Sequence, residues 1–178
     1  TRWTGDWSSD VCSSDLRLEN KVFLIVDDDP MQLRLIEKVV SLIGGVKVMA
    51  ATGGHQALEI FRQGRVDFVL CDLMMFPMDG FELCRNIRKL PFANVKQIPI
   101  IVSTGYSTML NVESARDAGA TEILRKPYNP VKLFDRVLSV LDRPRDFIAQ
   151  PHFRGPDRRR KFLTPPGVGE RRFSAPVK

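Results

Sequence analysis

The stretch "VFLIVDDDP" (Val22–Pro30) joins an apolar run directly to three aspartates. Three more apolar runs end in polar residues: Phe68–Cys71 in Asp72, Ile98–Val102 in Ser103 and Thr104, and a shorter one in Lys126. Short, nearly continuous runs of Val, Ile and Leu are typical of strands buried on both faces. The carboxyl ends of parallel strands share one edge of a sheet, where open α/β sheets bind ligands. We therefore expect the polar residues to form one site.

Helical patterns lie between these runs. Asp29 before Pro30 is typical of a helix N-cap with proline in the first turn, and Gly44 and Gly45 would end that helix. Its apolar stripe would contain Met31, Leu35, Val39 and Leu42. We further expect a strand at Val46–Ala50, a helix with Ala57, Leu58 and Phe61 inward, helices at Gly80–Lys89 and Ser107–Asp117, and one at Asn129–Leu141 with Val131, Phe134, Leu138 and Leu141 on one stripe. Five βα units predict an α/β fold with a doubly wound, five-stranded parallel sheet and five helices.

The charge at the shared edge indicates a cation site. Asp27, Asp28 and Asp72 would form a group of carboxylates that repels itself unless protons or a cation intervene. Mg²⁺ takes oxygen ligands and typically binds one or two carboxylates together with a substrate phosphate. A carboxylate can also be a nucleophile and form an aspartyl phosphate. Thr104 and Lys126 suit donor roles, because phosphoryl transfer depends mainly on positioning and on neutralising the transferred oxygens.

Four segments together resemble the receiver domain of two-component response regulators, in the stand-alone CheY-like arrangement. They are "VDDDP" (Val26–Pro30), "CDLMMFPMDG" (Cys71–Gly80), "PIIVSTG" (Pro99–Gly105) and "GATEILRKPY" (Gly119–Tyr128). The resemblance covers residues 20–141 and implies a flavodoxin-like fold. It also implies a phosphoacceptor in a bacterial phosphorelay rather than an enzyme that turns over a substrate.

The resemblance assigns roles to the residues at the sheet edge. Asp72 would accept a phosphoryl group from a sensor histidine kinase or a phosphotransfer protein. The Mg²⁺ ligands would be Asp27, Asp28, Asp72 and the Met74 carbonyl oxygen, Thr104 and Lys126 would contact the phosphoryl oxygens, and the Lys126–Pro127 peptide would be cis. Phosphorylation would change a surface around the fourth helix, fifth strand and fifth helix, which binds a downstream protein target.

Three departures from the family pattern limit this comparison. Phe76 precedes Pro77, so the proline comes one place later than usual in the loop after the acceptor. Ile123 stands where many members carry an aromatic residue that turns inward, so an aromatic rotamer cannot be the switch. Met74 and Tyr106 are bulky at positions that tune water access, and we expect them to shield the phosphoryl group.

Other interpretations remain open at this point. The acidic residues and Lys126 could form a structural ion-pair network, since such networks also perturb pKa values. The chain could be a degenerate receiver that serves only as an interaction scaffold. A DNA-binding transcription factor is disfavoured because no output domain is evident. Cys71 and Cys84 indicate small buried apolar residues with no disulfide or zinc pattern, which is typical of a cytoplasmic protein.

The first sixteen residues differ in character from the rest. "GDWSSDVCSSDL" (Gly5–Leu16) resembles a translated sequencing-library adapter, and it lacks the basic start and apolar centre of a signal peptide. We interpret residues 1–16 as an adapter-derived artefact and expect them to be disordered, because they have little to bury. The receiver domain is then expected at residues 17–141, with no membrane span.

The basic charge of the chain lies in residues 142–178. This segment holds ten Lys and Arg against four Asp and Glu, whereas residues 1–141 hold seventeen of each, so the net charge of +6 belongs to the segment. It carries a local echo, "GPDRRR" (Gly155–Arg160) and "GERR" (Gly169–Arg172). With little periodicity over 37 residues, it is too short for a winged-helix or helix-turn-helix domain. We therefore expect a basic tail rich in Pro and Arg.

The function of this tail has several possible explanations. It could be a solvated, disordered segment, as blocks of like charge commonly are. Alternatively, its arginines could bind phosphate or carboxylate, because guanidinium groups form bidentate contacts with both. The ligand would be cyclic di-GMP, an acidic partner surface or, nonspecifically, a nucleic acid; specific DNA binding is not expected. The candidate anion-binding residues are Arg158, Arg159, Arg160, Arg171 and Arg172.

Overall fold

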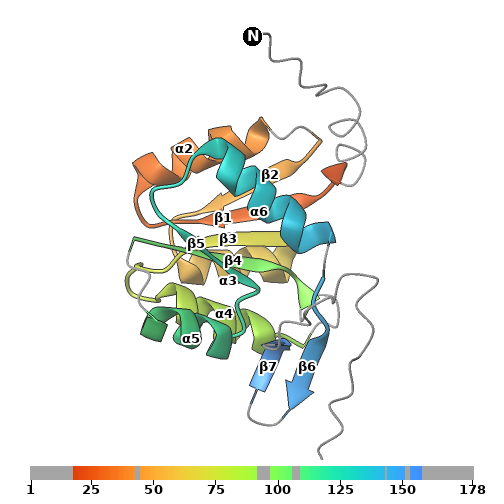
Figure 1. The fold of residues 1–178 in the computed structure, drawn as a ribbon. Helices are drawn as coiled ribbons and strands as arrows, with labels where there is room; N and C mark the ends of the chain where they lie inside the picture. The colour runs from red at the N-terminus through yellow and green to blue at the C-terminus, as the bar shows by residue number, and fades with distance from the viewer. Residues whose placement is uncertain are drawn as a thin grey trace, which may run out of the picture.

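The computed structural model describes residues 18–42, 45–91, 97–105, 109–142, 144–150 and 153–157. Figure 1 shows the elements in chain order. They are β1 (Val22–Val26), α2 (Pro30–Ser41), β2 (Lys47–Ala51), α3 (Gly54–Gln63), β3 (Phe68–Asp72), α4 (Gly80–Lys89), β4 (Ile100–Thr104), α5 (Met109–Asp117), β5 (Glu122–Arg125), α6 (Pro130–Asp142), β6 (Phe147–Gln150) and β7 (Phe153–Pro156). No helix in these ranges is long and apolar enough to cross a membrane.

Strands β1 to β5 form one parallel sheet in the order β2-β1-β3-β4-β5. In this register Val26 of β1 pairs with Cys71 of β3, and Asp72 pairs with Ser103 of β4. The predicted doubly wound sheet with its five helices is confirmed. The strand order changes direction between β1 and β3, and ligands of open α/β sheets bind at the carboxyl ends of the strands beside such a switch point.

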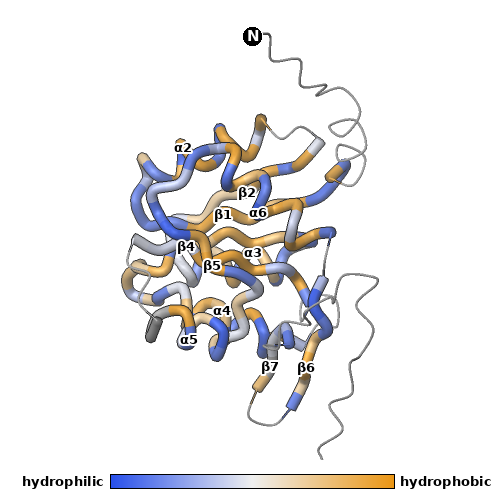
Figure 2. The backbone as a smooth tube through the Cα atoms, in the orientation of Figure 1, coloured by the Kyte–Doolittle hydropathy of each residue, from blue (hydrophilic) through white to orange (hydrophobic). Residues whose placement is uncertain are grey.

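Helices cover both faces of the sheet (Figure 1). Helices α2 and α6 lie on one face, where their apolar side chains pack with Phe23, Ile25 and Ile101. Helices α3, α4 and α5 lie on the other face and pack against Leu24 and Val69. The strands are accordingly the most continuously apolar part of the chain (Figure 2).

The buried stripe of α2 differs from the predicted one. Its buried residues are Leu33, Ile36 and Val40, whereas Met31, Leu35 and Leu42 of the predicted stripe are exposed. The helix carries two apolar stripes at helical spacing, and the sequence pattern alone does not decide between them. The Asp29 cap, whose Oδ1 accepts a hydrogen bond from Met31 N (2.8 Å), fixes where the helix begins. Packing of α2 against β1 and β2 turns the stripe of Leu33, Ile36 and Val40 toward the sheet.

The last helix, α6, shows an offset of one position in the opposite direction. The buried residues of α6 are Leu133, Val137 and Val140, and Val131 is 61% exposed. The other predicted members, Phe134, Leu138 and Leu141, are partly buried against the same core. The prediction therefore identified the helix but placed the centre of its buried face one position away.

Strands β6 and β7 form an antiparallel hairpin that was not predicted from the sequence. Phe147 pairs with Pro156 across the two strands, and Asp157 N donates to Asp146 O (2.7 Å) at the open end of the hairpin. Strand β7 packs against α4 and α5, at the amino-terminal edge of the main sheet (Figure 1). Part of the segment expected to be a tail is thus packed on the domain.

Arg88 of α4 connects the hairpin to the domain. Its side chain is buried, with Nε donating to Gly119 O (3.0 Å) and Nη1 donating to Ile98 O (2.7 Å). The guanidinium carbon lies 5.7 Å from the centroid of the Phe147 ring in β6. Burial lowers the pKa of Arg88 to about 10, so the side chain remains charged at neutral pH.

Two further contacts hold the hairpin in place. Gly155 of β7 lies so close to Gly119 that a Cβ atom on Gly155 would come within 2.8 Å of the Gly119 Cα. Arg145, just before β6, lies 3.5 Å from Glu122 at the start of β5, measured between Nη2 and Oε2. Both contacts involve the segment that leads from α5 into β5.

Candidate functional site

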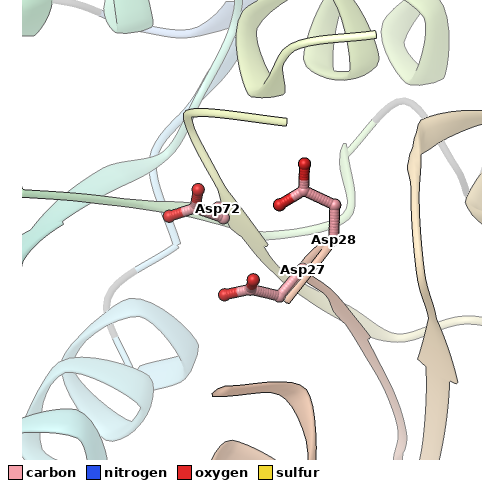
Figure 3. Close-up of side chains that lie close together, drawn as sticks. All are labelled: Asp27, Asp28 and Asp72. Atoms are coloured by element: carbon pink, nitrogen blue, oxygen red, sulfur yellow. The ribbon is translucent and has the colours of Figure 1, made fainter. Parts of the chain in front are cut away.

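The residues predicted to form the site lie at the carboxyl ends of the strands. Asp27 and Asp28 directly follow β1, Asp72 ends β3, Thr104 ends β4 and Lys126 directly follows β5. One carboxylate oxygen from each of the three aspartates lies within 4.8 Å of the others (Figure 3). The structure therefore brings together acidic residues that are separated by more than forty positions in the sequence.

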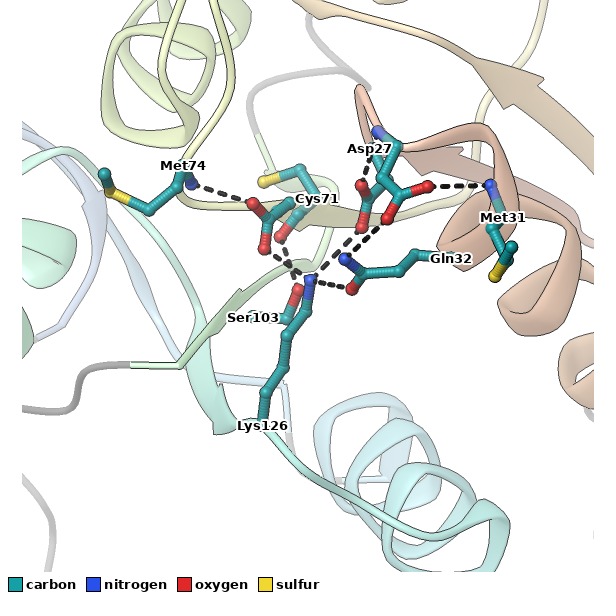
Figure 4. A network of polar contacts seen from close by, with 9 residues as sticks. Asp27, Met31, Gln32, Cys71, Met74, Ser103 and Lys126 are labelled. Atoms are coloured by element: carbon teal, nitrogen blue, oxygen red, sulfur yellow. Dashed lines mark hydrogen bonds and ion pairs between the residues drawn. The ribbon is translucent and has the colours of Figure 1, made fainter.

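Lys126 extends into this acidic group (Figure 4). Its Nζ lies 2.6 Å from Asp72 Oδ1 and 3.2 Å from Asp27 Oδ2. It also donates to Gln32 Oε1 at 2.8 Å. The ammonium group therefore meets two carboxylates and one neutral amide.

The loop after β3 orients Asp72 and Asp28. Asp72 Oδ2 accepts a hydrogen bond from Met74 N (2.9 Å), and Asp28 Oδ2 accepts one from Phe76 N (3.1 Å). The loop with the displaced proline thus still delivers backbone donors to the acidic group. Its Phe76–Pro77 peptide is cis.

Gly80 closes this loop at the start of α4. Its N donates to Leu73 O (2.9 Å), and a Cβ at this position would overlap with the carbonyl oxygen of Asp72. Any larger residue would therefore displace the backbone at Asp72, where β3 ends. Asp79 caps α4 by accepting from Glu82 N (2.7 Å).

Burial and charge act in opposite directions on two groups of the site. Burial of Asp27 raises the pKa of its carboxyl, against the Asp29 backbone hydrogen bond and the charge of Lys126, which lower it. For Lys126, burial is the largest single effect and lowers the pKa, but the hydrogen bonds and charges of Asp72 and Asp27 together outweigh it. The pKa of Lys126 is consequently raised.

The remaining predicted positions have different outcomes. Thr104 is buried at the site edge, and its backbone oxygen accepts from Lys126 N (2.8 Å). The Lys126–Pro127 peptide is cis, as predicted. The side chain of Met74 is 68% exposed and extends away from the Lys126 ammonium group (Figure 4), which does not support its predicted role as a water shield. Ile123 is partly buried against the core.

Some predictions concern residues outside the described ranges. These are the shielding role of Tyr106, residues 1–16 as an adapter-derived segment, and the anion-binding residues Arg158, Arg159, Arg160, Arg171 and Arg172.

Gln32 contacts the site although the sequence pattern did not predict it there. Asp29 caps α2 as predicted, but its second oxygen also accepts from Gln32 Nε2 (3.1 Å), and Gln32 bonds to Lys126 in turn. A usable signal was present, because Gln at the third helical position after an Asp cap is the pattern of a capping box. In a capping box the Gln would accept from the backbone N–H of the cap residue, but here Asp29 N donates to Asp27 Oδ1 (3.0 Å), and the Gln32 amide joins the Asp29 carboxylate to Lys126.

The donor set fits a hard divalent cation. The acidic group offers only carboxylate oxygens, with backbone amides holding their orientation, and Mg²⁺ prefers such ligands with part of its water shell retained. Within the described ranges, no other group of at least three His, Cys, Asp or Glu residues could hold a metal ion.

A protein-family model matches the part of the chain that forms the sheet and its helices. The family model described as "Response regulator receiver domain" matches residues 23–138, from β1 into α6. The chain belongs to this family. The receiver domain accounts for the sheet, its five helices and the acidic group, whereas the β6–β7 hairpin lies beyond the matched residues.

Curated relatives of the receiver domain are longer proteins. One is the "Probable transcriptional regulator ycf27" of Guillardia theta, 35% identical over 129 residues, which cover 72% of this chain and 48% of the relative. Another is the "Transcriptional regulatory protein YvrH" of Bacillus subtilis, 32% identical over 126 residues, covering 71% and 51%. The chain spans about half the length of these relatives.

Solved structures of similar receiver domains match the fold. A putative response regulator from Chloroflexus aurantiacus is 31% identical, with a TM-score of 0.64, and the match covers 70% of this chain and 100% of that one. The receiver domain of sensor histidine kinase PA1611 from Pseudomonas aeruginosa is 26% identical, with a TM-score of 0.63 and coverage of 70% and 99%. That structure has a magnesium ion coordinated in the active site cleft.

Proposed function

We propose that this receiver domain is a phosphoacceptor that takes a phosphoryl group on Asp72 in a magnesium-dependent reaction. The donor is the phosphohistidine of a sensor histidine kinase or of a phosphotransfer protein. The phosphorylated form then changes its binding surface for a downstream protein target. The domain acts as a signalling acceptor rather than as an enzyme that releases a product.

The hydrogen bonds of the Asp72 carboxylate carry this proposal. Lys126 Nζ lies 2.6 Å from one oxygen and Met74 N lies 2.9 Å from the other. The carboxylate is thus oriented from two sides at the sheet edge where strand order reverses. A nucleophile held in this way loses little freedom when it reacts, which favours transfer by positioning.

The transfer forms one bond and breaks one bond. An Asp72 carboxylate oxygen attacks the phosphorus, the P–O bond of the acyl phosphate forms, and the P–N bond of the phosphohistidine breaks. The bonding electrons remain on the leaving imidazole nitrogen. Lys126, whose Nζ lies 2.6 Å from Asp72 Oδ1, would neutralise negative charge on the transferred oxygens, and the hydroxyl group of Thr104 would donate a hydrogen bond to them.

Asp27, Asp28 and Asp72 would hold the magnesium ion, together with the carbonyl oxygen of Met74. When bound, the ion supplies positive charge to the phosphoryl oxygens in the transition state. The oxygen-only donor set supports this assignment. The ion in the related PA1611 receiver domain supports it as well.

Exposed apolar side chains near the site support docking of a protein donor. Met31 and Leu35 on the first turns of α2, and Phe76 in the loop after β3, are 80%, 62% and 85% exposed. A groove along α2 is lined by Pro30, Met31, Arg34, Leu35 and Lys38. Such apolar exposure beside a reactive carboxylate suits a protein donor better than a free small molecule.

Rival functions make different predictions. A degenerate receiver used only as a scaffold would bind partners without becoming phosphorylated. The relatives are named transcriptional regulators, so the absence of specific DNA binding stays a prediction for the full-length protein.

Cys71 and Cys84 are buried free thiols, which supports action in the reducing cytoplasm.

Labelling with acetyl phosphate and Mg²⁺ tests the proposal. Intact-mass analysis should detect one added phosphoryl group in the wild type, and chelation of the metal should prevent its addition. Asp72→Asn should abolish labelling, whereas Asp135→Asn, which changes an exposed aspartate of α6, should leave it intact. Labelling that persists in Asp72→Asn would refute the acceptor assignment, and an unlabelled wild type would favour the scaffold.

A further inference from the structure

Gln32 forms a side-chain bridge between the start of α2 and the candidate site (Figure 4). Its Nε2 donates to Asp29 Oδ2 (3.1 Å), and its Oε1 accepts from Lys126 Nζ (2.8 Å). Asp29 is itself fixed by the hydrogen bond that Oδ1 accepts from Met31 N (2.8 Å). A continuous series of hydrogen bonds therefore runs from the backbone of α2 to the ammonium group of Lys126.

We propose that Gln32 is a positioning residue that holds Lys126 in place for phosphoryl transfer to Asp72. This inference rests on the proposed function of the site. Gln32 acts only through Lys126, so it is not assigned any contact with the phosphoryl group or with the metal ion.

The chemistry of the three Lys126 partners supports this role. An ammonium group has three N–H donors, and here they meet Asp27, Asp72 and Gln32. Two of these partners must change their interactions during the reaction, because Asp72 becomes an acyl phosphate and Asp27 is a proposed metal ligand. Gln32 is neither the proposed acceptor nor a proposed metal ligand, so its hydrogen bond to Lys126 need not change during the reaction. It can therefore hold Lys126 throughout the transfer.

A neutral amide is better suited to this task than a carboxylate. The site already contains a group of three carboxylates, and a fourth negative charge would increase their mutual repulsion. It would also compete for Lys126 against the incoming phosphoryl oxygens. The amide oxygen of Gln32 holds the ammonium group without adding charge.

The two neighbours of Gln32 fix the orientation of its amide. A carboxylate only accepts hydrogen bonds and an ammonium group only donates them. The amide nitrogen must therefore face Asp29 and the oxygen must face Lys126, since a flipped amide would place like partners together at both ends. The bridge thus has one stable arrangement, although the side chain itself is exposed.

Replacing Gln32 with leucine tests the role, because leucine has a similar size and high helix propensity but no polar atoms. We expect the initial rate of Asp72 phosphorylation by acetyl phosphate, at saturating Mg²⁺, to fall about fivefold, as for the loss of one hydrogen bond at an exposed position. The matched control is Gln63→Leu. Gln63 is also an exposed helical glutamine with a carboxylate partner, Glu59 at 3.1 Å, but it lies at the far end of α3. Its replacement should leave the rate unchanged.

A double-mutant cycle separates positioning from a general structural effect. If Gln32 acts through Lys126, Gln32→Leu should reduce the rate in the wild type but have no further effect in Lys126→Met. A reduction of the same size in both backgrounds would overturn the proposal. So would an unchanged rate in Gln32→Leu alone, or a loss of folding stability that matches the loss of rate.

The proposed function and this inference fail in distinguishable ways. A wild-type protein that is not labelled at all would overturn both. A wild type that is labelled on Asp72, with a Gln32→Leu variant that reacts at the same rate, would overturn only the role of Gln32.

Discussion

The guanidinium group of Arg88 lies against the ring of Phe147, 5.7 Å from its centroid, and joins helix α4 to the hairpin strand β6. The same group donates to two backbone carbonyls, those of Gly119 and Ile98. Because the Arg88 side chain is 2% exposed, water cannot easily replace these donors. The hairpin and the edge of the sheet therefore depend on one buried cation.

Replacing Arg88 with methionine should destabilise the domain. The variant leaves two buried carbonyls without these donors, at about 1–3 kcal/mol each, and the removed cost of burying a charge offsets part of the loss. We expect the free energy of unfolding to fall by about 2 kcal/mol in urea titrations. Arg85→Met changes an exposed arginine on the same helix and should have little effect. Equal stability of the two variants would contradict the role of Arg88.

A side chain at Gly155 should push the hairpin away from the domain. In Gly155→Ala, the new Cβ would meet the Gly119 Cα at 2.8 Å, and neither backbone can move freely. We expect a loss of about 1–3 kcal/mol in the free energy of unfolding, as for other overpacked sites. Gly64→Ala is the control, because no atom lies within 4 Å of its Cβ position. A Gly155→Ala variant as stable as this control would show that the contact does not hold the hairpin.

Removing Lys126 should strengthen binding of Mg²⁺. Its ammonium group now neutralises Asp72 and Asp27, so Lys126→Ala leaves more negative charge for the ion, although it should lose the surface change that follows phosphorylation. We expect the dissociation constant measured by calorimetry to decrease several-fold, to about a third of the wild-type value or less. Lys132→Ala, at an exposed position of α6, should leave it unchanged. Weaker binding in Lys126→Ala would mean that the lysine organises the acidic group instead of competing with the ion.

Met74 should have little influence on the lifetime of the phosphorylated state. Its side chain is 68% exposed and extends away from the Lys126 ammonium group, so Met74→Asn does not open a new path for water. We expect the rate of dephosphorylation, followed by loss of the phosphoryl group, to stay within about twofold of the wild-type rate. A marked acceleration would show that Met74 folds over the phosphoryl group after transfer.

The arginines after residue 157 require a deletion that spares the hairpin. A deletion that begins at residue 150 would remove β7, whereas removal of residues 158–178 leaves both hairpin strands intact. If these arginines form a cyclic di-GMP site, calorimetry should detect saturable one-site binding that the deletion abolishes while Asp72 phosphorylation persists. If they act as a charge patch, many polyanions should bind, with log affinity falling linearly with log salt. No cyclic di-GMP binding at low salt would exclude the nucleotide site.

The sheet and the acidic group were predictable because their signals are local. Each apolar run marked a strand, and the polar residue at its end had to meet the others once the strands were parallel. Asp72 and Lys126 lie together for this reason, although more than fifty residues separate them. The parallel arrangement of the strands was inferred from the helical patterns that lie between the apolar runs.

The buried stripes and the hairpin depend on tertiary contacts, which is why the sequence did not reveal them. Leu33 and Leu35 are equally apolar, and only the rotation of α2 on the sheet decides which one is buried. The hairpin strands are short and show no clear alternation, and their position depends on Arg88 from a distant helix. The bridge through Gln32 likewise exists only after α2 and β5 come together.

The hairpin and Asp72 lie at opposite ends of the sheet. Gly119 and Glu122, which the hairpin segment contacts, precede or begin β5, whereas Asp72 ends β3. Five-residue strands separate these ends by about 17 Å. Asp157, which bonds to Asp146 beside the hairpin, therefore lies at the end of the sheet remote from Asp72. A partner that binds the described hairpin would therefore lie about one strand length from Asp72, and its binding need not obstruct access to that carboxylate.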